Sequence, residues 1–190
     1  MNVECLPVGM LSTNCYVVWD EAKTAVVIDP GDEAPKIEKF LADNGLKCAW
    51  ILLTHGHFDH IGALAAVKEA TGAKVAIGAG DADCIKFPPD RISRDGDVIR
   101  AGELEFTAVE TPGHTPGGVC YLCGDTLFSG DTLFFESVGR TDLPKGDFNA
   151  LRASLAKLRA LPQADLLVLP GHAESTTMSH ERACNPFMGR

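Results

Sequence analysis

The chain has 190 residues, of which 45% are hydrophobic and 23% charged, the composition of an ordinary globular protein with one sizeable core. With 17 basic and 26 acidic side chains, its formal net charge of -9 disfavours a general binder of phosphate backbones, so we expect no nucleic-acid partner. No apolar run approaches the roughly 18 residues of a membrane span, and no secretory signal is visible. Seven cysteines without framework spacing indicate reduced thiols, and we expect a cytoplasmic protein.

The first third of the chain alternates apolar runs with turns. We expect strands over residues 3–8, 14–19 and 24–28, followed by a helix that Asp32 caps and Gly45 ends. Asp29, which follows the third strand, could orient a metal-bound histidine. A turn before the next residue, a proline, is the interpretation that the sequence favours.

Residues 54–60 hold three histidines and one aspartate between a buried apolar strand and an alanine-rich helix. His55 and His57 are two positions apart in extended chain and therefore point to the same side. Asp59 and His60 stand near the helix start and must point elsewhere. This arrangement suits two neighbouring metal ions better than one, and a merely solvated polar loop is the alternative.

The rest of the chain continues with short strands and a few helices. We expect strands over residues 50–53, 74–77, 97–100, 103–109, 119–123, 126–129 and 165–169. Helices are expected over residues 61–70, after a cap at Asp147, and after a cap at Ser179. Residues 78–94, with two prolines in the middle, are expected to form an irregular edge of a site.

Four candidate ligands directly follow apolar strands: His55, His114, Asp131 and His172. Loops at strand ends gather at one rim of a sheet, where a site can form. Runs of strands separated by a few helices predict an α/β fold of two packed sheets with helices on the outer faces.

The number of ligand side chains exceeds what one tetrahedral zinc ion needs. A first metal ion would be held by His55, His57 and His114. A second would be held by Asp59, His60 and His172, and the Asp131 carboxylate would bridge the two ions. Two ions about 3.5–4 Å apart can hold a hydroxide that attacks a carbonyl or phosphoryl centre. His180 follows no strand and is interpreted as a surface residue, and Cys120 and Cys123 as two small buried side chains.

Residues 54–60 match the T-H-x-H-x-D-H signature of the metallo-β-lactamase superfamily, and the later ligands follow in the expected order over nearly the whole chain. The resemblance implies a four-layer αβ/βα sandwich, the metallo-β-lactamase fold, as a single domain over residues 1–190 with the metal site at one rim of the sheets. True β-lactamases usually have cysteine where Asp131 stands, which argues against antibiotic hydrolysis.

Within that superfamily, residues 129–134 and 139–144, together with residues 181–187, resemble the short bacterial glyoxalase II-like hydrolases. The resemblance implies a thioester substrate such as hydroxyacylglutathione. It also implies two divalent metal ions, zinc with iron or manganese as alternatives, and a hydroxide that Asp59 orients. Arg140 stands where glyoxalase II has a basic residue that contacts glutathione, and a salt bridge to Asp142 is the alternative.

Full-length glyoxalase II has a C-terminal helical domain that helps to bind glutathione, and we expect no such domain here. Asp142 and Glu174 also stand where that family has tyrosines near glutathione. The resemblance therefore supports the metal chemistry more strongly than the identity of the substrate. The sequence leaves the oligomeric state open.

Three other functions are alternatives to the hydrolase. A persulfide dioxygenase would use one iron ion held by His55, His114 and Asp131, but that family usually has cysteine where Val138 stands. A nuclease or phosphodiesterase of the same superfamily is disfavoured by the acidic charge. A non-catalytic metal-binding protein would not need an open site for two metal ions.

Overall fold

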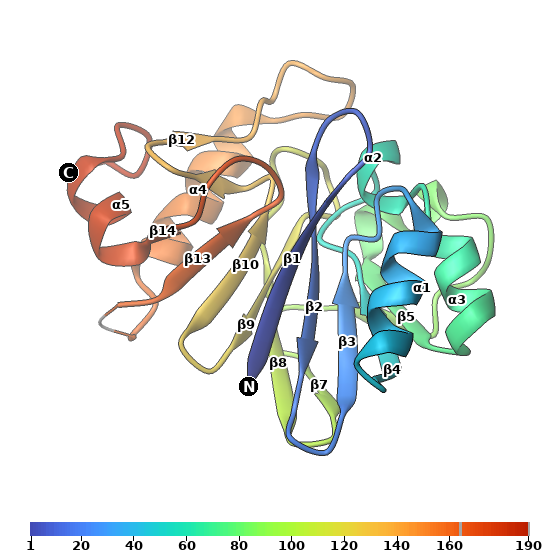
Figure 1. Cartoon of the computed structure of the whole chain (residues 1–190). Helices are drawn as coiled ribbons and strands as arrows, with labels where there is room; N and C mark the ends of the chain where they lie inside the picture. The colour runs from blue at the N-terminus through green and yellow to red at the C-terminus, as the bar shows by residue number, and fades with distance from the viewer. Residues whose placement is uncertain (164, 190) are drawn as a thin grey trace.

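The computed structural model describes residues 1–163 and 165–189, in which two six-stranded sheets face each other (Figure 1). The first sheet contains, in spatial order, β1 (Asn2–Val8), β2 (Thr13–Trp19), β3 (Thr24–Ile28), β4 (Lys47–Leu52), β5 (Lys74–Gly78) and β6 (Arg91–Ser93). The second contains β14 (Thr176–Thr177), β13 (Leu167–Pro170), β10 (Thr126–Gly130), β9 (Val119–Cys123), β8 (Leu104–Glu110) and β7 (Val98–Ala101). A separate hairpin pairs β11 (Leu133–Phe134) with β12 (Ser137–Val138).

Helices cover the outer faces of both sheets. α1 (Ala34–Asp43) and α3 (Leu64–Thr71) lie on the first sheet, and α4 (Phe148–Arg159) and α5 (Met178–Cys184) lie on the second (Figure 1). The short α2 (Phe58–Ile61) and the 3-10 helix η1 (Ala79–Cys84) lie in loops. The expected four-layer αβ/βα sandwich is confirmed. No helix of the described ranges is long and apolar enough to cross a membrane.

Three apolar layers hold the sandwich together, because alternate residues of a strand face opposite sides of a sheet. In β2, Cys15 and Val17 pack under α1 and α3, while Val18 packs between the two sheets. Cys120 and Cys123 behave the same way, one under α4 and the other between the sheets, so both are buried free thiols as predicted. Each fully buried aliphatic side chain contributes about 1.5–3 kcal/mol, so the fold does not depend on a metal ion for its core.

The strand directions bring the site loops to one rim. β3, β4, β5 and β6 run parallel, and β10 runs parallel to β13. Their carboxyl ends therefore lie on the same side of the sandwich, at the top of the view in Figure 1, next to the β1–β2 turn and α2.

Two helix starts differ from the expectation, and one agrees with it. The N-cap of α1 is Glu33, whose side chain makes no cap hydrogen bond, so the predicted Asp32 cap is wrong. The N-cap of α5 is Thr177, which accepts a hydrogen bond from the His180 backbone N–H, so Ser179 lies inside the helix. Asp147 caps α4 as predicted, since its carboxylate accepts from the backbone N–H groups of the next turn.

Helix formation also begins earlier than expected after β4. α2 starts at Phe58, so Asp59 and His60 are helical residues, and the continuous helix expected over residues 61–70 is divided into α2 and α3. Gly31 allows this turn to approach the sheet, because a Cβ there would lie 1.7 Å from the Asp59 carbonyl oxygen. The stretch 78–94 is more regular than expected and contains η1 and β6.

Candidate metal centre

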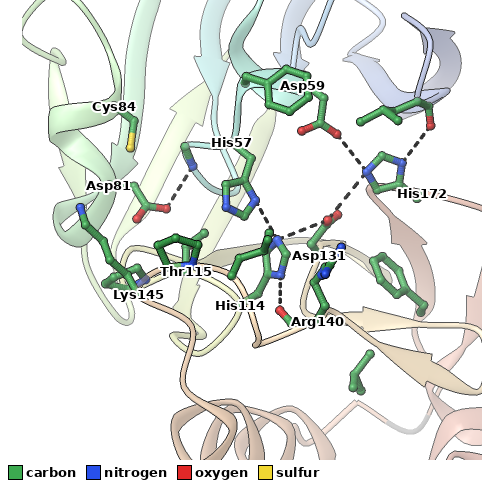
Figure 2. Close-up of a pocket in the computed structure, with 18 of the residues that line it drawn as sticks. His57, Asp59, Asp81, Cys84, His114, Thr115, Asp131, Arg140, Lys145 and His172 are labelled. Atoms are coloured by element: carbon green, nitrogen blue, oxygen red, sulfur yellow. Dashed lines mark hydrogen bonds and ion pairs between the residues drawn. The ribbon is translucent and has the colours of Figure 1, made fainter.

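All seven predicted ligand side chains meet at the rim where β4, β8, β10 and β13 end. They come from the loop after β4 and the start of α2, from the loop after β8, and from the residues just after β10 and β13. Figure 2 shows His57 and His114 directed at each other on one side, Asp59 and His172 on the other, and Asp131 between them.

The first set has three imidazole nitrogens facing one another. His57 Nδ1 lies 3.1 Å from His55 Nε2 and 2.9 Å from His114 Nε2. These three ligand atoms all lie within 4.8 Å of one another, close enough to surround one ion. They are the side chains that the sequence assigned to a first metal ion.

The second set lies beside the first. His172 Nε2 lies 3.3 Å from His60 Nε2 and 3.2 Å from Asp59 Oδ2. The distance from His60 Nε2 to Asp59 Oδ2 is 3.6 Å. These three residues are again those that the sequence grouped for a second ion.

Asp131 contacts both sets. Its Oδ2 lies 3.4 Å from His114 Nε2 and 3.7 Å from His172 Nε2, and its Oδ1 lies 3.5 Å from His60 Nε2. This carboxylate therefore lies between the two sets, and its role as a ligand shared by two ions stays a prediction.

Hydrogen bonds on the far side of the rings set the tautomers. His60 Nδ1 donates to Asp29 Oδ2 at 2.9 Å, His114 Nδ1 donates to the Arg140 carbonyl oxygen at 2.7 Å, and His172 Nδ1 donates to a backbone carbonyl oxygen at 3.2 Å. In its neutral form with the proton on Nδ1, each ring directs the bare lone pair of Nε2 into the site. Metal-binding histidines in proteins are oriented in this way.

This donor arrangement fits bound cations. Ring nitrogens from both sets converge at 2.9–3.3 Å, and a divalent ion in each set would give them a common partner. Asp131 Oδ1 is also buried and has no hydrogen-bond partner within the described residues, which is costly for a carboxylate oxygen. Imidazole and carboxylate ligands suit zinc, iron and manganese, so the residues fit two divalent ions of this kind.

Asp29 orients the second set and is not a simple turn residue. Its Oδ1 accepts from the Thr54 backbone N–H at 2.7 Å, and its Oδ2 accepts from Thr54 Oγ1 and His60 Nδ1. Burial alone would lower the pKa of His60, but the charge of Asp29 and its hydrogen bond raise it to about 9. The turn interpretation that the sequence favoured is therefore wrong, because the next strand brings Thr54 and His60 against this carboxylate.

His55, His57 and Asp59 have pKa values that favour binding of a cation. Burial, with the neighbouring imidazoles, holds the pKa of His55 well below its usual range, and burial also lowers the pKa of His57. Burial alone would raise the pKa of Asp59, but its hydrogen bond with His172 and the charge of His60 hold it well below the usual range. His55 and His57 are therefore neutral and Asp59 is ionised near pH 7.

Asp81 was not recognised in the sequence, where it lies in the stretch expected to be irregular. Its side chain lies near His57 in Figure 2. The buried carboxylate accepts from the Gly56 backbone N–H at 3.0 Å and from the Gly117 backbone N–H at 3.1 Å. Both donors belong to loops that carry ligand histidines. Only the fold brings η1 between these loops, so no local sequence signal could have identified Asp81.

Replacement of Asp81 should loosen the first set. Asp81→Ala leaves two backbone N–H groups without their acceptor, and we expect a loss of about 1–3 kcal/mol in the free energy of unfolding. We also expect metal affinity about 10–100-fold weaker, because the loops that orient the histidines are no longer tied together. Calorimetric unfolding and metal titration measure the two effects, and unchanged metal affinity would show that the loops hold their positions without Asp81.

A cavity of about 940 Å³ opens onto the centre. Arg140 and Lys145 are the basic side chains that line it (Figure 2). Arg140 Nε and Nη2 each donate to the Asp142 carboxylate at 2.7 Å, so the salt bridge considered for this residue is present. The hydrogen bond from Arg140 lowers the pKa of Asp142 to about 2.

His180 lies outside this centre, as predicted. Its Nε2 is 3.0 Å from Glu136 Oε1, and its ring stacks on Phe135 with centroids 5.0 Å apart. These contacts join α5 to the β11–β12 hairpin.

Residues 8–172 match the metallo-beta-lactamase superfamily, and this range contains every predicted ligand. The chain belongs to this superfamily. A hydroxyacylglutathione hydrolase GloC of Haemophilus influenzae is 33% identical, with 99% of this chain and 98% of that protein aligned. A hydroxyacylglutathione hydrolase of Cereibacter sphaeroides is 40% identical over 97% of this chain and 71% of its own length. This member of the superfamily is a metal-dependent hydrolase.

Solved structures of the superfamily agree with the fold. The BLEG-1 B3 metallo-beta-lactamase has a TM-score of 0.93 at 35% identity, covering 98% of this chain and 99% of its own. ETHE1 from Myxococcus xanthus has a TM-score of 0.89 at 36% identity, covering 98% and 84%. TTHA1623, solved in a di-iron-bound form, has a TM-score of 0.85 at 39% identity, covering 97% and 99%.

Proposed function

We propose that this protein is a binuclear hydrolase that cleaves small-molecule thioesters. The observation that carries the proposal is the pair of ligand sets on either side of Asp131, at the floor of an open cavity of about 940 Å³. A cavity of this size accommodates a small organic substrate. The similarity to two hydroxyacylglutathione hydrolases, at 33% and 40% identity, supports a thioester as the substrate.

Each set of ligand side chains would bind one metal ion. His55, His57 and His114 would hold one divalent ion, Asp59, His60 and His172 would hold the other, and Asp131 would contact both. Bound there, the ions supply a Lewis acid for the thioester carbonyl and lower the pKa of a water molecule toward neutrality. We favour zinc, with iron and manganese as alternatives for the same donor set.

Asp59 would position the attacking water. Its Oδ2 accepts a hydrogen bond from Thr13 Oγ1 at 3.1 Å and faces His172 Nε2, so the carboxylate is fixed at the edge of the cavity. Because its pKa is low, it remains ionised near pH 7 and can accept a hydrogen bond from that water. The side chain then orients one oxygen lone pair of the water toward the thioester carbonyl carbon.

Arg140 remains the candidate for contact with an anionic thiol carrier. Its ion pair with Asp142 limits how much this contact can contribute to substrate binding. A glutathione carboxylate would have to compete with Asp142 for an exposed guanidinium. We therefore expect Arg140→Ala to raise KM for a glutathione thioester by less than about threefold, a value within the range of exposed ion pairs. Steady-state kinetics with a glutathione and a neutral thioester measure this, and a tenfold increase for glutathione alone would show a direct contact.

The second candidate function is that of a mononuclear-iron persulfide dioxygenase. The similarity to ETHE1 from Myxococcus xanthus favours it. That function would use His55, His114 and Asp131, and it gives no role to the second set gathered around His172.

One experiment separates the two functions. Protein loaded with a measured amount of metal is incubated with thioesters without oxygen, and separately with glutathione persulfide in an oxygen electrode. We expect thioester cleavage without oxygen and no oxygen uptake. Oxygen uptake with no thioester cleavage would replace the hydrolase proposal with the dioxygenase.

A further inference from the structure

The walls of the cavity above the metal centre are largely apolar. The side chains that form them come from the β1–β2 turn, the start of α2, the β11–β12 hairpin and the loop before α4, namely Leu11, Phe58, Phe134, Val138, Leu143 and Pro144. Segments far apart in the sequence thus present apolar groups to one space. The proposed reaction uses only the polar floor of the cavity, so it does not account for this cluster of apolar side chains.

Two of these apolar side chains are unusually exposed. Phe58 is 75% exposed and Leu11 is 54% exposed, although both lie next to a site. Isolated exposed apolar residues are common, but a group that lines one concave surface indicates a surface that binds an apolar ligand. The Leu11 backbone carbonyl also accepts from His172 Nδ1, so this wall is tied to the metal centre.

The charged groups of the rim do not favour an anionic ligand. Both basic side chains that line the cavity already have acidic partners, Arg140 with Asp142 at 2.7 Å and Lys145 with Asp83 at 3.5 Å. An anionic carrier would meet an acidic side chain beside each of these cations, whereas an apolar group only displaces water from Leu11, Phe58 and their neighbours.

We infer that the cavity selects thioesters with an aliphatic or arylalkyl arm and does not require a charged thiol carrier. The inference rests on the proposed function, whose substrate class it narrows. Leu11, from the β1–β2 turn, and Leu143, from the loop before α4, are the specificity-determining residues that can be changed without altering a ligand side chain.

Binding of uncleavable analogues tests the preference without catalysis. S-methyl, S-butyl and S-hexyl thioethers of N-acetylcysteamine are titrated into the metal-loaded protein by calorimetry. Each methylene that becomes buried should tighten Kd by about fourfold. Leu11→Ser and Leu143→Ser should reduce the dependence of Kd on the length of the alkyl chain. The matched control is Leu167→Ser, at a 43% exposed leucine of β13 outside the cavity, and it should leave this dependence unchanged. A flat series in the unmodified protein, or equal flattening by Leu167→Ser, overturns the inference.

Hydrolysis measurements separate this inference from the proposed function. We expect kcat/KM to rise from acetyl to hexanoyl thioesters of N-acetylcysteamine, and Asp142→Asn, which releases Arg140, to improve only the glutathione thioester. Tight binding of apolar thioethers without cleavage of any thioester refutes the proposed function and supports the selectivity of the cavity. Faster cleavage of lactoylglutathione than of every neutral apolar thioester refutes the selectivity and supports the thioesterase.

Discussion

Asp131→Ala is expected to release at least one metal ion and to lower kcat/KM for a thioester by at least about 100-fold. Loss of a residue that only orients a metal ligand lowers activity by up to about 100-fold, and loss of a ligand should cost at least as much. The carboxylate faces both ligand sets, and without it two cations would confront each other with no negative charge between them. The fold should persist, because the apolar layers supply its core.

The matched control is Asp125→Ala, which removes an exposed carboxylate at the opposite end of β10. Elemental analysis, circular dichroism and steady-state kinetics are compared for the two variants. Normal metal content and near-normal turnover in Asp131→Ala would mean that the ligand assignment is wrong.

Asp29→Asn should weaken the second ion selectively. The amide oxygen can still accept a hydrogen bond from the Thr54 backbone N–H. The amide NH2 group would then face the Nδ1–H of His60, and because both groups are donors no hydrogen bond can form between them. Loss of such an orienting partner lowers metal affinity about 10–100-fold. Asparagine tolerates the backbone φ of 51° at this position, so the change is confined to the side chain.

Asp20→Asn is the control, because Asp20 is also a buried carboxylate that accepts backbone N–H groups, far from the centre. Competition with a chromogenic chelator measures the affinity for each ion. We expect one strong and one weakened site in Asp29→Asn and two unchanged sites in Asp20→Asn. Two unchanged sites in both variants would leave Asp29 with a purely structural role.

The sequence predicted most of the fold because the apolar runs are nearly continuous and end in ligand residues. β3, for example, has the expected bounds, and β2 begins only one residue before its expected start. The grouping of the ligand side chains into two sets was predictable because His55 and His57 share one side of an extended segment.

What could not be predicted depends on contacts between distant segments. Asp81 acts through backbone groups of Gly56 and Gly117, and none of these pairings leaves a local pattern. The sequence offered two roles for Asp29, and the choice between them requires β3 and β4 to lie side by side. Gly171 is similar, since a Cβ there would lie 2.4 Å from Asp131 Oδ1, a proximity that only the parallel pairing of β10 and β13 creates.

The metal content of the protein, combined with a crystal structure that uses anomalous scattering to locate each ion, tests the central claim most directly. The protein is produced with ample zinc, iron and manganese, and the ions are counted by elemental analysis. Two equivalents per chain are expected, one within reach of His57 and the other within reach of His60, with Asp131 between them. A stable plateau at one equivalent, with His57, Asp59 and His60 free of metal, would contradict the binuclear hydrolase.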